Sequence, residues 1–454
     1  MAIIVFFICF INAIFIFYYI KIIKANKYYI KIFNSKNEVS IRKFPYPYKA
    51  AIAIANDIDS TNTVEEFINI HEFLNTKKMT NMGEGVGLEI ADSFFMFNPK
   101  NHFSYFSNRE IDKFIIRKFI EAGYIDSIHS WGDGYSDRND AIKSISELKK
   151  QCLNLKIWIN HSKEKSNFGG WYSANLGDCV ESKYYHSDIT LSYGIKFVWL
   201  GSSTCIIGQS VPINFMTFIG SFDFKYAIKS TRNIVKDIIK NIFSLFRLWE
   251  TRYSLHWKND LVKVVELKDG QKVYEFTRYD NHPDGIGFGA DSKNMAYNLS
   301  ERVIKQLKDV RGYGILYTHF GINFDCKHEI CEETQKALRN LEKEYRTGEV
   351  YVTTTSKLLT YYISQKNLKT IYSINQGEVI IEILCVEDPI FGKFIPNLEE
   401  LQGITFYVPS DKNVRILIDG KEIQDLIKNK MDENNRESVT IPIQHLTYPD
   451  LMKI

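Results

Sequence analysis

Short apolar runs alternate with longer amphipathic stretches from residue 45 to residue 366. The run 49–56 has the length of a buried strand, whereas Val64–Asn75 carries its apolar residues at helical spacing. Strands that alternate with helices predict βα units and a parallel sheet, and this many units predict a βα barrel. Further strands are expected at 124–129, 155–160, 195–201, 313–318 and 349–353, and further helices at 108–122, 140–150, 292–310 and 332–346.

The alternation stops between residues 209 and 277, which predicts an insertion in the barrel. Within it, 225–249 has the pattern of a basic amphipathic helix whose apolar side carries Ile234, Ile238 and Ile242. Such a helix is able to lie on a membrane surface. Packing against the barrel is the commoner arrangement for an amphipathic helix, and the pattern alone favours it.

Short β-rich runs fill the chain from residue 367 to residue 454, and Asp419-Gly420 has the sequence of a hairpin turn. This pattern predicts a small accessory domain of the β-sandwich kind. Packing is its expected role, with carbohydrate contact as the alternative.

The segment Met1 to Ile20 contains one clearly polar residue, Asn12, and no charged residue. At about 1.5 Å per residue it is long enough to cross a hydrocarbon core. It lacks the positive n-region and the small-residue cleavage site of a signal peptide, so we expect a transmembrane anchor over 1–23. Residues 21–43 hold seven lysines and arginines against Glu38 alone, and this bias predicts a cytoplasmic position for the rest of the chain.

Composition narrows the class of protein. With 45% hydrophobic and 24% charged residues, the 454-residue chain is typical of globular proteins and suits a barrel with an appended domain. The net charge of +3 gives no general case for nucleic-acid binding. The seven cysteines contain no CxxC pair, which argues against a structural zinc site, and we expect Cys326 and Cys331 to be free thiols.

Chemically active side chains follow several of the expected strands. They are Asp57 and Asp59 after the first strand, His129 and Asp133 after 124–129, His161 after 155–160, and His319 after 313–318. The C-terminal ends of barrel strands converge on one face, where catalysis takes place. These side chains are therefore expected to form one site.

The residue types at these strand ends suit metal-assisted hydrolysis. Two carboxylates and an imidazole can hold a divalent metal and leave a position open. Such a metal activates water and polarises a carbonyl group. A further carboxylate can accept a proton, and a histidine opposite can supply one. The sequence therefore predicts a metal-dependent hydrolase.

The order of these motifs resembles that of the polysaccharide deacetylase superfamily (NodB-homology, carbohydrate esterase 4) over about residues 46–366. Those proteins are distorted (β/α)7 barrels that remove acetyl groups from N-acetylated sugars. Asp57-Ile58-Asp59 matches the family's acidic pair, which implies Asp57 as the general base and Asp59 as a metal ligand.

Two further motifs carry the resemblance. His129-Ser130-Trp131-Gly132-Asp133 matches H-[ST]-x-x-H with Asp133 in place of the second histidine, which implies His129 and Asp133 as metal ligands. Tyr317-Thr318-His319 resembles the late histidine motif, which implies His319 as the general acid.

The family's arginine-containing motif is absent, and Asn160-His161-Ser162 stands in its place. His161 could orient the base, bind substrate or bind metal, and we group it with Asn160 and Trp131 as substrate-binding candidates. Zinc is the expected metal, with manganese, cobalt and iron as alternatives, because Asp133 is a harder ligand than histidine.

The resemblance implies a membrane-bound enzyme that hydrolyses a carbon–nitrogen bond other than a peptide bond. Its expected substrate is an N-acetylated polysaccharide or its lipid-linked precursor. An O-acyl hydrolase, another C–N hydrolase and a non-catalytic carbohydrate-binding protein are the alternatives. Family precedent favours the extracytoplasmic side of the membrane, in contrast to the lysine bias.

Overall fold

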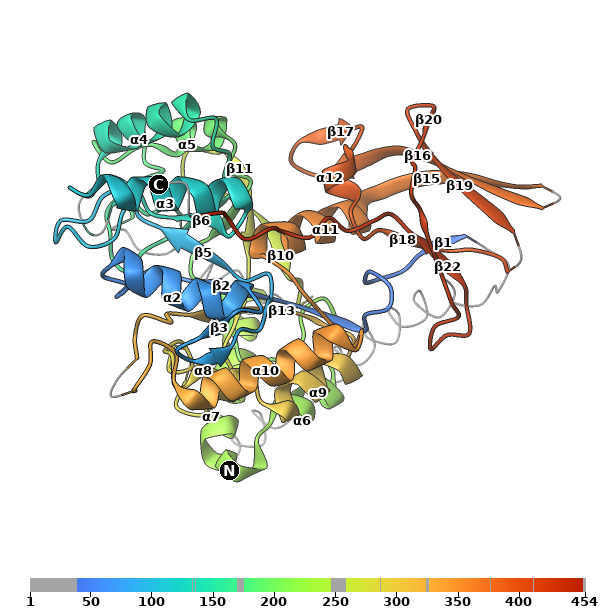
Figure 1. Ribbon diagram of the computed structural model, residues 1–454, viewed down its shortest axis with the longest axis horizontal. Helices are drawn as coiled ribbons and strands as arrows, with labels where there is room; N and C mark the ends of the chain where they lie inside the picture. The colour runs from blue at the N-terminus through green and yellow to red at the C-terminus, as the bar shows by residue number, and fades with distance from the viewer. Residues whose placement is uncertain are drawn as a thin grey trace, which may run out of the picture.

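The computed structural model of the chain describes residues 39–132, 134, 136–169, 175–245, 259–285, 287–323, 326–375, 377–410 and 412–451. The expected anchor at 1–23 and the expected ligand Asp133 lie outside these residues. Within the parts described, no helix is both long enough and apolar enough to cross a membrane. Figure 1 shows an α/β domain beside a β-rich C-terminal domain.

The α/β domain is built on one curled sheet of eleven strands that forms a half-barrel. Along the sheet the strands are β10 (Val262–Glu266), β11 (Lys272–Phe276), β8 (Phe197–Trp199), β7 (Ile157–Ile159), β6 (Ile125–His129), β5 (Ala91–Phe94), β2 (Ala50–Asn56), β13 (Tyr313–Thr318), β12 (Arg278–Tyr279) and β9 (Ser203–Thr204), with β14 (Val350–Val352) also on β2. Every pairing is parallel except that of β10 with β11. The prediction of a mixed α/β fold on a parallel sheet is therefore confirmed.

The curl of the sheet depends on β11 and β12, which are separated by Thr277 alone. β11 pairs with β8, whereas β12 pairs with both β9 and β13. One short stretch of chain therefore links the β8 side of the sheet to the β13 side.

β2 is the central strand, and all of its residues are buried. Ala51, Ala53 and Ala55 lie in a cluster with side chains of β7, β8, β11 and β13. Ile52 and Ile54 pack on the other face against α2 (Val64–Asn75), α9 (Glu301–Asp309) and α10 (Glu332–Arg346). A strand covered on both faces needs a continuous apolar run, which is what 49–56 supplies.

Helices cover the outer face of the sheet (Figure 1). Gly123 ends α3 (Glu110–Ala122) in the left-handed conformation, with φ of 83°, and Asp137 and Asp140 form a capping box at the start of α4 (Arg138–Lys150). The domain also contains α5 (Ser187–Tyr193), α8 (Met295–Asn298), α11 (Thr355–Asn367) and the hairpin of β3 (Met79–Thr80) with β4 (Gly83–Glu84).

The single helix expected at 292–310 is wrong, because the chain forms α8 and α9 separately. Ser300 takes an extended conformation at the start of α9. Met295 and Leu299 are both buried in the core, so the chain bends where these two side chains pack.

The interval 209–277, which was expected to be an insertion, has one part outside the central sheet and one part within it. Its first part forms α6 (Phe215–Ser221), the 3₁₀ turn η1 (Phe224–Tyr226) and α7 (Ala227–Leu245). Its last part forms β10 and β11, which join the central sheet.

The C-terminal domain consists of two sheets around one core. Val379, Ile381, Phe406 and Val439 are among the buried side chains between them. One sheet contains β1 (Ser40–Ile41), β18 (Thr405–Tyr407), β22 (Ser438–Thr440) and β21 (Ile427–Asn429). The other sheet contains β15 (Leu368–Asn375), β16 (Glu378–Asp388), β19 (Asn413–Ile418), β20 (Lys421–Glu422) and β17 (Gly392–Phe394). The short helix α12 (Leu398–Leu401) lies between β17 and β18 in the chain.

The end of the chain returns to the α/β domain, as Figure 1 shows for the segment that runs to α3. Leu446 and Tyr448 pack against the core beneath α3, and Leu446 N donates to the carboxylate of Glu89 at 2.8 Å. The same carboxylate accepts from Lys357 of α11 at 2.8 Å. The last residues thereby fasten the two domains together.

Candidate metal centre

Asp57 and Asp59 follow β2 at the end of the sheet. Asp57 N donates to Thr318 O at 2.8 Å, and the side chain of Asn56 accepts from Phe320 N at 2.8 Å. These bonds hold the ends of β2 and β13 side by side. The side chain of Asp59 is 25% exposed and that of Asp57 is 2% exposed, so Asp59 reaches solvent and Asp57 does not.

His129 ends β6 and lies near both carboxylates. Its Nε2 is 3.2 Å from Oδ1 of Asp59, and its Nδ1 is 3.8 Å from Oδ1 of Asp57. Ser130 follows in the left-handed region, with φ of 55°, and its backbone N donates to Ile159 O of β7. The strand therefore turns away directly after His129 and leaves the imidazole in the site.

His161 follows β7 and reaches the same carboxylate. Its Nε2 is 3.3 Å from Oδ2 of Asp59, and its Nδ1 is 2.5 Å from Oε1 of Glu164. Asn167 fixes the loop, because its side chain accepts from His161 N and donates to His161 O, both at 2.9 Å. Glu164 is buried and also accepts from Gly134 N at 2.6 Å. The imidazole of His161 is thus held by a carboxylate on the side away from Asp59.

Asp59, His129 and His161 form a group that could hold a metal ion, because their ligand atoms all lie within 4.8 Å of one another. Although Oδ1 of Asp59 and Nε2 of His129 lie 3.2 Å apart, neither atom, nor Nδ1 of His129, makes a hydrogen bond of normal geometry within the described residues, and all three atoms are buried. Buried polar atoms are nearly always paired, and a bound cation is one way to satisfy them. One carboxylate and two imidazoles are also a common ligand set for a catalytic metal. The residues therefore fit a metal.

The group that the structure brings together differs from the expected ligands Asp59, His129 and Asp133. His161, which was expected at the substrate, lies in the metal group beside Asp59 and His129. Asp133, the expected third ligand, falls outside the described residues.

His319 brings a fourth strand to the site, since it follows β13. Its Nε2 is 3.4 Å from Oδ2 of Asp59, and its Nδ1 lies 3.1 Å from Ala290 O. Its backbone N also donates to Ala290 O, at 2.6 Å. Burial alone would lower the pKa of His319, but Asp59 and Asp57 offset this and raise it above its ordinary value.

Arg278 of β12 makes a two-point ion pair with Asp57. Its Nη1 donates to Oδ2 at 2.8 Å and its Nη2 to Oδ1 at 2.9 Å, while Ser93 Oγ donates to Oδ1 at 3.1 Å. The guanidinium carbon lies 4.2 Å from the ring centre of Trp199 and 4.8 Å from that of Tyr317. Asp57 is therefore held in place by a buried and oriented cation.

These contacts explain the acidity of the carboxyls. Burial would raise the pKa of Asp57, but the charges of Arg278 and His129 lower it below its ordinary value. The pKa of Asp59 is likewise lowered despite burial, because three histidines surround it. Burial lowers the pKa of His161, but the hydrogen bonds to Asp59 and Glu164 raise it by more, so that this pKa rises to about 10.

Arg278 and Glu164 are residues of the site that the sequence analysis missed. The sequence motif places the arginine after the strand at 155–160, whereas Arg278 comes directly after the interval 209–277 that the pattern predicts to be an insertion. The segment Tyr274-Glu275-Phe276-Thr277-Arg278 carried a usable signal, since it places a charged residue at the end of an alternating strand pattern.

The side chains of Trp131 and Asn160, which were expected to bind substrate, are both buried, so neither is open to a substrate in this structure. Trp131 is 0% exposed, and its Nε1 donates to Nδ1 of His186 at 3.1 Å. Asn160 accepts from Trp158 Nε1 at 2.9 Å and from Phe168 N at 3.0 Å. Each side chain stabilises the loop that presents a site histidine.

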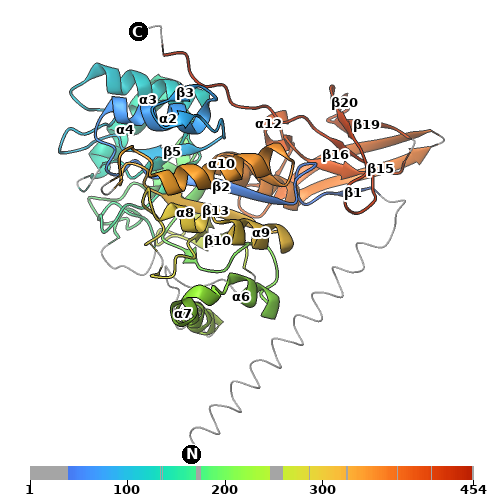
Figure 2. The same cartoon turned by 60° about the horizontal axis from the view of Figure 1, so that its bottom comes forward.

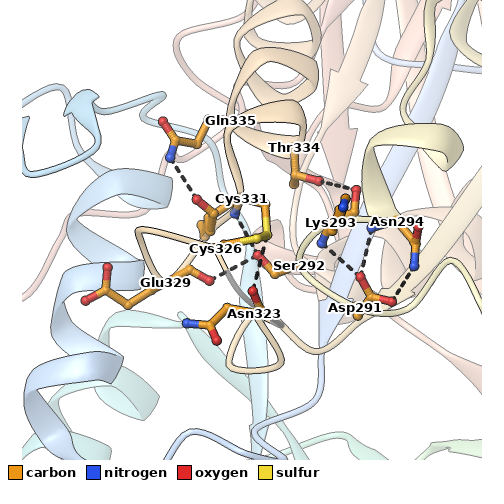
Figure 3. The surroundings of a disulfide bond; sticks show 11 residues. Asp291, Ser292, Lys293, Asn294, Asn323, Cys326, Glu329, Cys331, Thr334 and Gln335 are labelled. Atoms are coloured by element: carbon orange, nitrogen blue, oxygen red, sulfur yellow. Dashed lines mark hydrogen bonds between the residues drawn. A yellow bond between two sulfur atoms is a disulfide. The ribbon is translucent and has the colours of Figure 1, made fainter.

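The loop after His319 is closed by a disulfide between Cys326 and Cys331, so the expectation of free thiols is wrong. Figure 3 shows the bond at the start of α10. Cys331 N donates to Ser292 Oγ at 2.8 Å, and Ser292 Oγ donates to Glu329 O at 3.0 Å. The loop is therefore fastened both to α10 and to the segment before α8.

An open cleft of about 500 Å³ lies beside this disulfide, between 291–294 and 326–333. Its lining includes Asp291, Asn294 and His328, and it does not include the metal group. Asp291 pairs with His319 along the backbone, so the cleft begins next to the site.

No protein-family model, no curated protein and no solved structure matches this chain. The chemistry of the site therefore has to be inferred from its own residues.

Proposed function

We propose that the protein is a metal-dependent hydrolase of the polysaccharide deacetylase type, which removes an N-acetyl group from a carbohydrate. The observation that carries this proposal is the convergence of a metal-binding group with a buried acid and a further histidine. Asp59, His129 and His161 are the group, and Asp57 and His319 are the flanking acid and histidine. Four parallel strands supply them, at the sheet end where α/β enzymes place their catalytic residues.

Zinc is the metal proposed, with manganese, cobalt and iron as alternatives, because nitrogen and carboxylate ligands suit all four. Asp59, His129 and His161 would hold it. When bound, the metal supplies Lewis acidity to the acyl carbonyl and to water. Glu164 fixes the imidazole of His161 through Nδ1, so that Nε2 faces Asp59.

The other residues move the protons. Asp57, kept ionised by Arg278, accepts a proton from the attacking water. The hydroxyl adds to the acyl carbon, the carbon–nitrogen bond breaks, and His319 donates a proton to the leaving nitrogen. The products are a free amine and a carboxylate.

The topology supports the proposed family relationship. A distorted (β/α)7 barrel needs a ring of seven parallel strands, and the succession β2, β5, β6, β7, β8, β11 with β12, and β13 supplies the pairings for it. Arg278 also supplies, from β12, an arginine that the expected motif lacks.

We place the proposed activity at a membrane, on its extracytoplasmic side. The disulfide between Cys326 and Cys331 supports this side, because disulfides persist in oxidising compartments. The lysine bias that follows residue 20 points to the opposite side. Protease accessibility in intact cells decides between them, since only an exterior domain is cleaved.

The proposal is tested with purified full-length protein, zinc and oligomers of N-acetylglucosamine, with released acetate as the readout. Asp57→Asn should retain zinc and reduce turnover by about 10² to 10⁴, the range for loss of a general base. Asp59→Asn is the matched variant, which should lose zinc and turnover together.

Three results would contradict the proposal. If turnover in Asp57→Asn falls only in proportion to the zinc content of the variant, Asp57 serves to position His129 and does not act as the general base. Release of acetate from O-acetylated sugars alone would indicate an O-acyl hydrolase. Stoichiometric zinc without turnover on either substrate class would indicate a carbohydrate-binding protein.

A further inference from the structure

We propose that α7 and the preceding turn η1 form a docking surface for an anionic lipid bilayer. Figure 2 shows α7 at the periphery of the α/β domain, away from the C-terminal domain. This inference does not depend on the hydrolytic chemistry.

The face of α7 that packs on the protein combines polar and apolar side chains, since Ile234 lies partly buried against the cluster that contains Ile206 and Ile213. Asp237 is 1% exposed, and its carboxylate accepts from Cys205 N at 2.9 Å and Thr204 Oγ1 at 3.1 Å. One further polar residue of this face, Ser230, is buried and accepts from Asp223 N at 3.1 Å. Hydrogen bonds therefore contribute much of the attachment of this helix.

The opposite face is apolar and exposed. Ile228 is 87% exposed, Val235 44% and Ile239 45%, and their spacing of seven and four residues places them on one side of the helix. Phe224 of η1, 76% exposed, lies one turn before Ile228. A surface helix usually turns its apolar side chains to the core, so this second, exposed apolar stripe calls for an apolar partner.

The charge around the apolar stripe identifies the partner. Lys225, Lys229, Arg232 and Lys236 belong to η1 and α7, and at helical spacing the last three lie along one flank of the stripe. Both acids of the segment, Asp223 and Asp237, are buried, and Lys229 is paired with Asp284 of a neighbouring loop, so Lys225, Arg232 and Lys236 carry the excess positive charge.

An apolar stripe bordered by cations matches the interface of a bilayer that contains anionic headgroups. The sequence supplies an independent reason for a bilayer nearby, because Met1 to Ile20 contains no charged residue. A second protein chain would match the stripe, but it would not account for the basic flank as directly.

The test places the photoreactive residue p-benzoylphenylalanine at position 235 of the full-length protein. Position 180 is the matched control, because Val180 is 60% exposed and lies in the loop before α5. Each protein is illuminated with vesicles of phosphatidylcholine that contain or lack phosphatidylglycerol, and cross-linked products are identified by mass spectrometry.

Lipid adducts should form at position 235 with phosphatidylglycerol present, at least about fivefold above position 180 and above the neutral vesicles. Lys225→Gln with Lys236→Gln should lower the yield by a similar factor, while circular dichroism and zinc content stay unchanged. Equal adduct yields at both positions, or in both kinds of vesicle, would overturn the proposal. Adducts to a second copy or to the chain's own N-terminal segment at position 235 would overturn it as well.

Discussion

Arg278 and Asp57 are joined by two parallel hydrogen bonds, of 2.8 and 2.9 Å, and both side chains are almost fully buried. Removing one partner of such a pair leaves a buried charge uncompensated, at a cost of about 3–5 kcal/mol. We therefore expect Arg278→Ala to lower the free energy of unfolding by about 3 kcal/mol in urea denaturation.

The double variant Asp57→Asn with Arg278→Met is the control for this pair. It should lose less stability than Arg278→Ala, because no unpaired charge is left in the core. In an active preparation, Arg278→Lys should also shift the acid limb of the pH–rate profile upward, since the two-point contact that lowers the pKa of Asp57 is weakened. Unchanged stability in Arg278→Ala would rule out the role assigned to the pair.

Glu164 should control the metal affinity of His161 without being a ligand. Loss of a carboxylate that orients a metal-binding histidine reduces affinity about 10- to 100-fold, and we expect this range for Glu164→Ala in zinc titrations. Glu164→Gln, which keeps a hydrogen-bond acceptor near Nδ1, should lose less. Glu399→Ala, a surface control whose side chain is 67% exposed, should leave zinc affinity unchanged. Equal affinities for Glu164→Ala and the surface control would contradict the role.

The disulfide between Cys326 and Cys331 should stabilise the loop beside His319. A cross-link that closes a loop of this length contributes about 2 kcal/mol, so Cys326→Ser with Cys331→Ser should lose up to that amount. Cys152→Ser, at an exposed free cysteine, is the matched control and should leave stability unchanged. Alkylation of both Cys326 and Cys331 without prior reduction, followed by mass spectrometry, would contradict the bond.

His186 should make stability depend on pH. It is fully buried, and burial lowers its pKa to about 4 although Ser166 O accepts its Nε2 proton. The unfolded chain then binds more protons than the folded chain between about pH 4 and the ordinary histidine value of about 6.5. The stability that this group contributes is complete above that window and is lost as the pH falls through it, by about 3 kcal/mol.

The measurement for His186 is urea denaturation at several values of pH from neutral to mildly acidic. His186→Gln should show a shallower loss of stability on acidification than the wild type, whatever its stability at neutral pH. Parallel pH dependences in the two proteins would rule out His186 as a source of the effect.

Much of the fold follows from local pattern. The apolar run that became β2 and the periodic stretches that became α2 and α10 coincide closely with the observed elements. They do so because burial on both faces of a strand, or on one face of a helix, leaves a regular trace in the sequence. The break at Ser300 left no such trace, since it depends on where Met295 and Leu299 meet the core.

The site was predictable in part for the same reason. Residues that end parallel strands converge whatever their distance in sequence, so the proximity of Asp59, His129 and His319 could be expected. The residues that hold these side chains in place could not be expected from the sequence. Glu164 and Arg278 act through tertiary contacts that no short motif records.

Zinc titration of the full-length protein is the decisive measurement for the group of Asp59, His129 and His161. We expect one tightly bound zinc per chain, retained in His319→Ala and bound at least about 100-fold more weakly in His161→Ala, because loss of a ligand weakens binding more than loss of a residue that only orients a ligand. Asp133→Ala, at the position the sequence motif suggested, is measured in parallel. Wild-type affinity in His161→Ala would show that His161 is not a ligand, and absence of zinc from the wild type would show that these residues do not form a metal site.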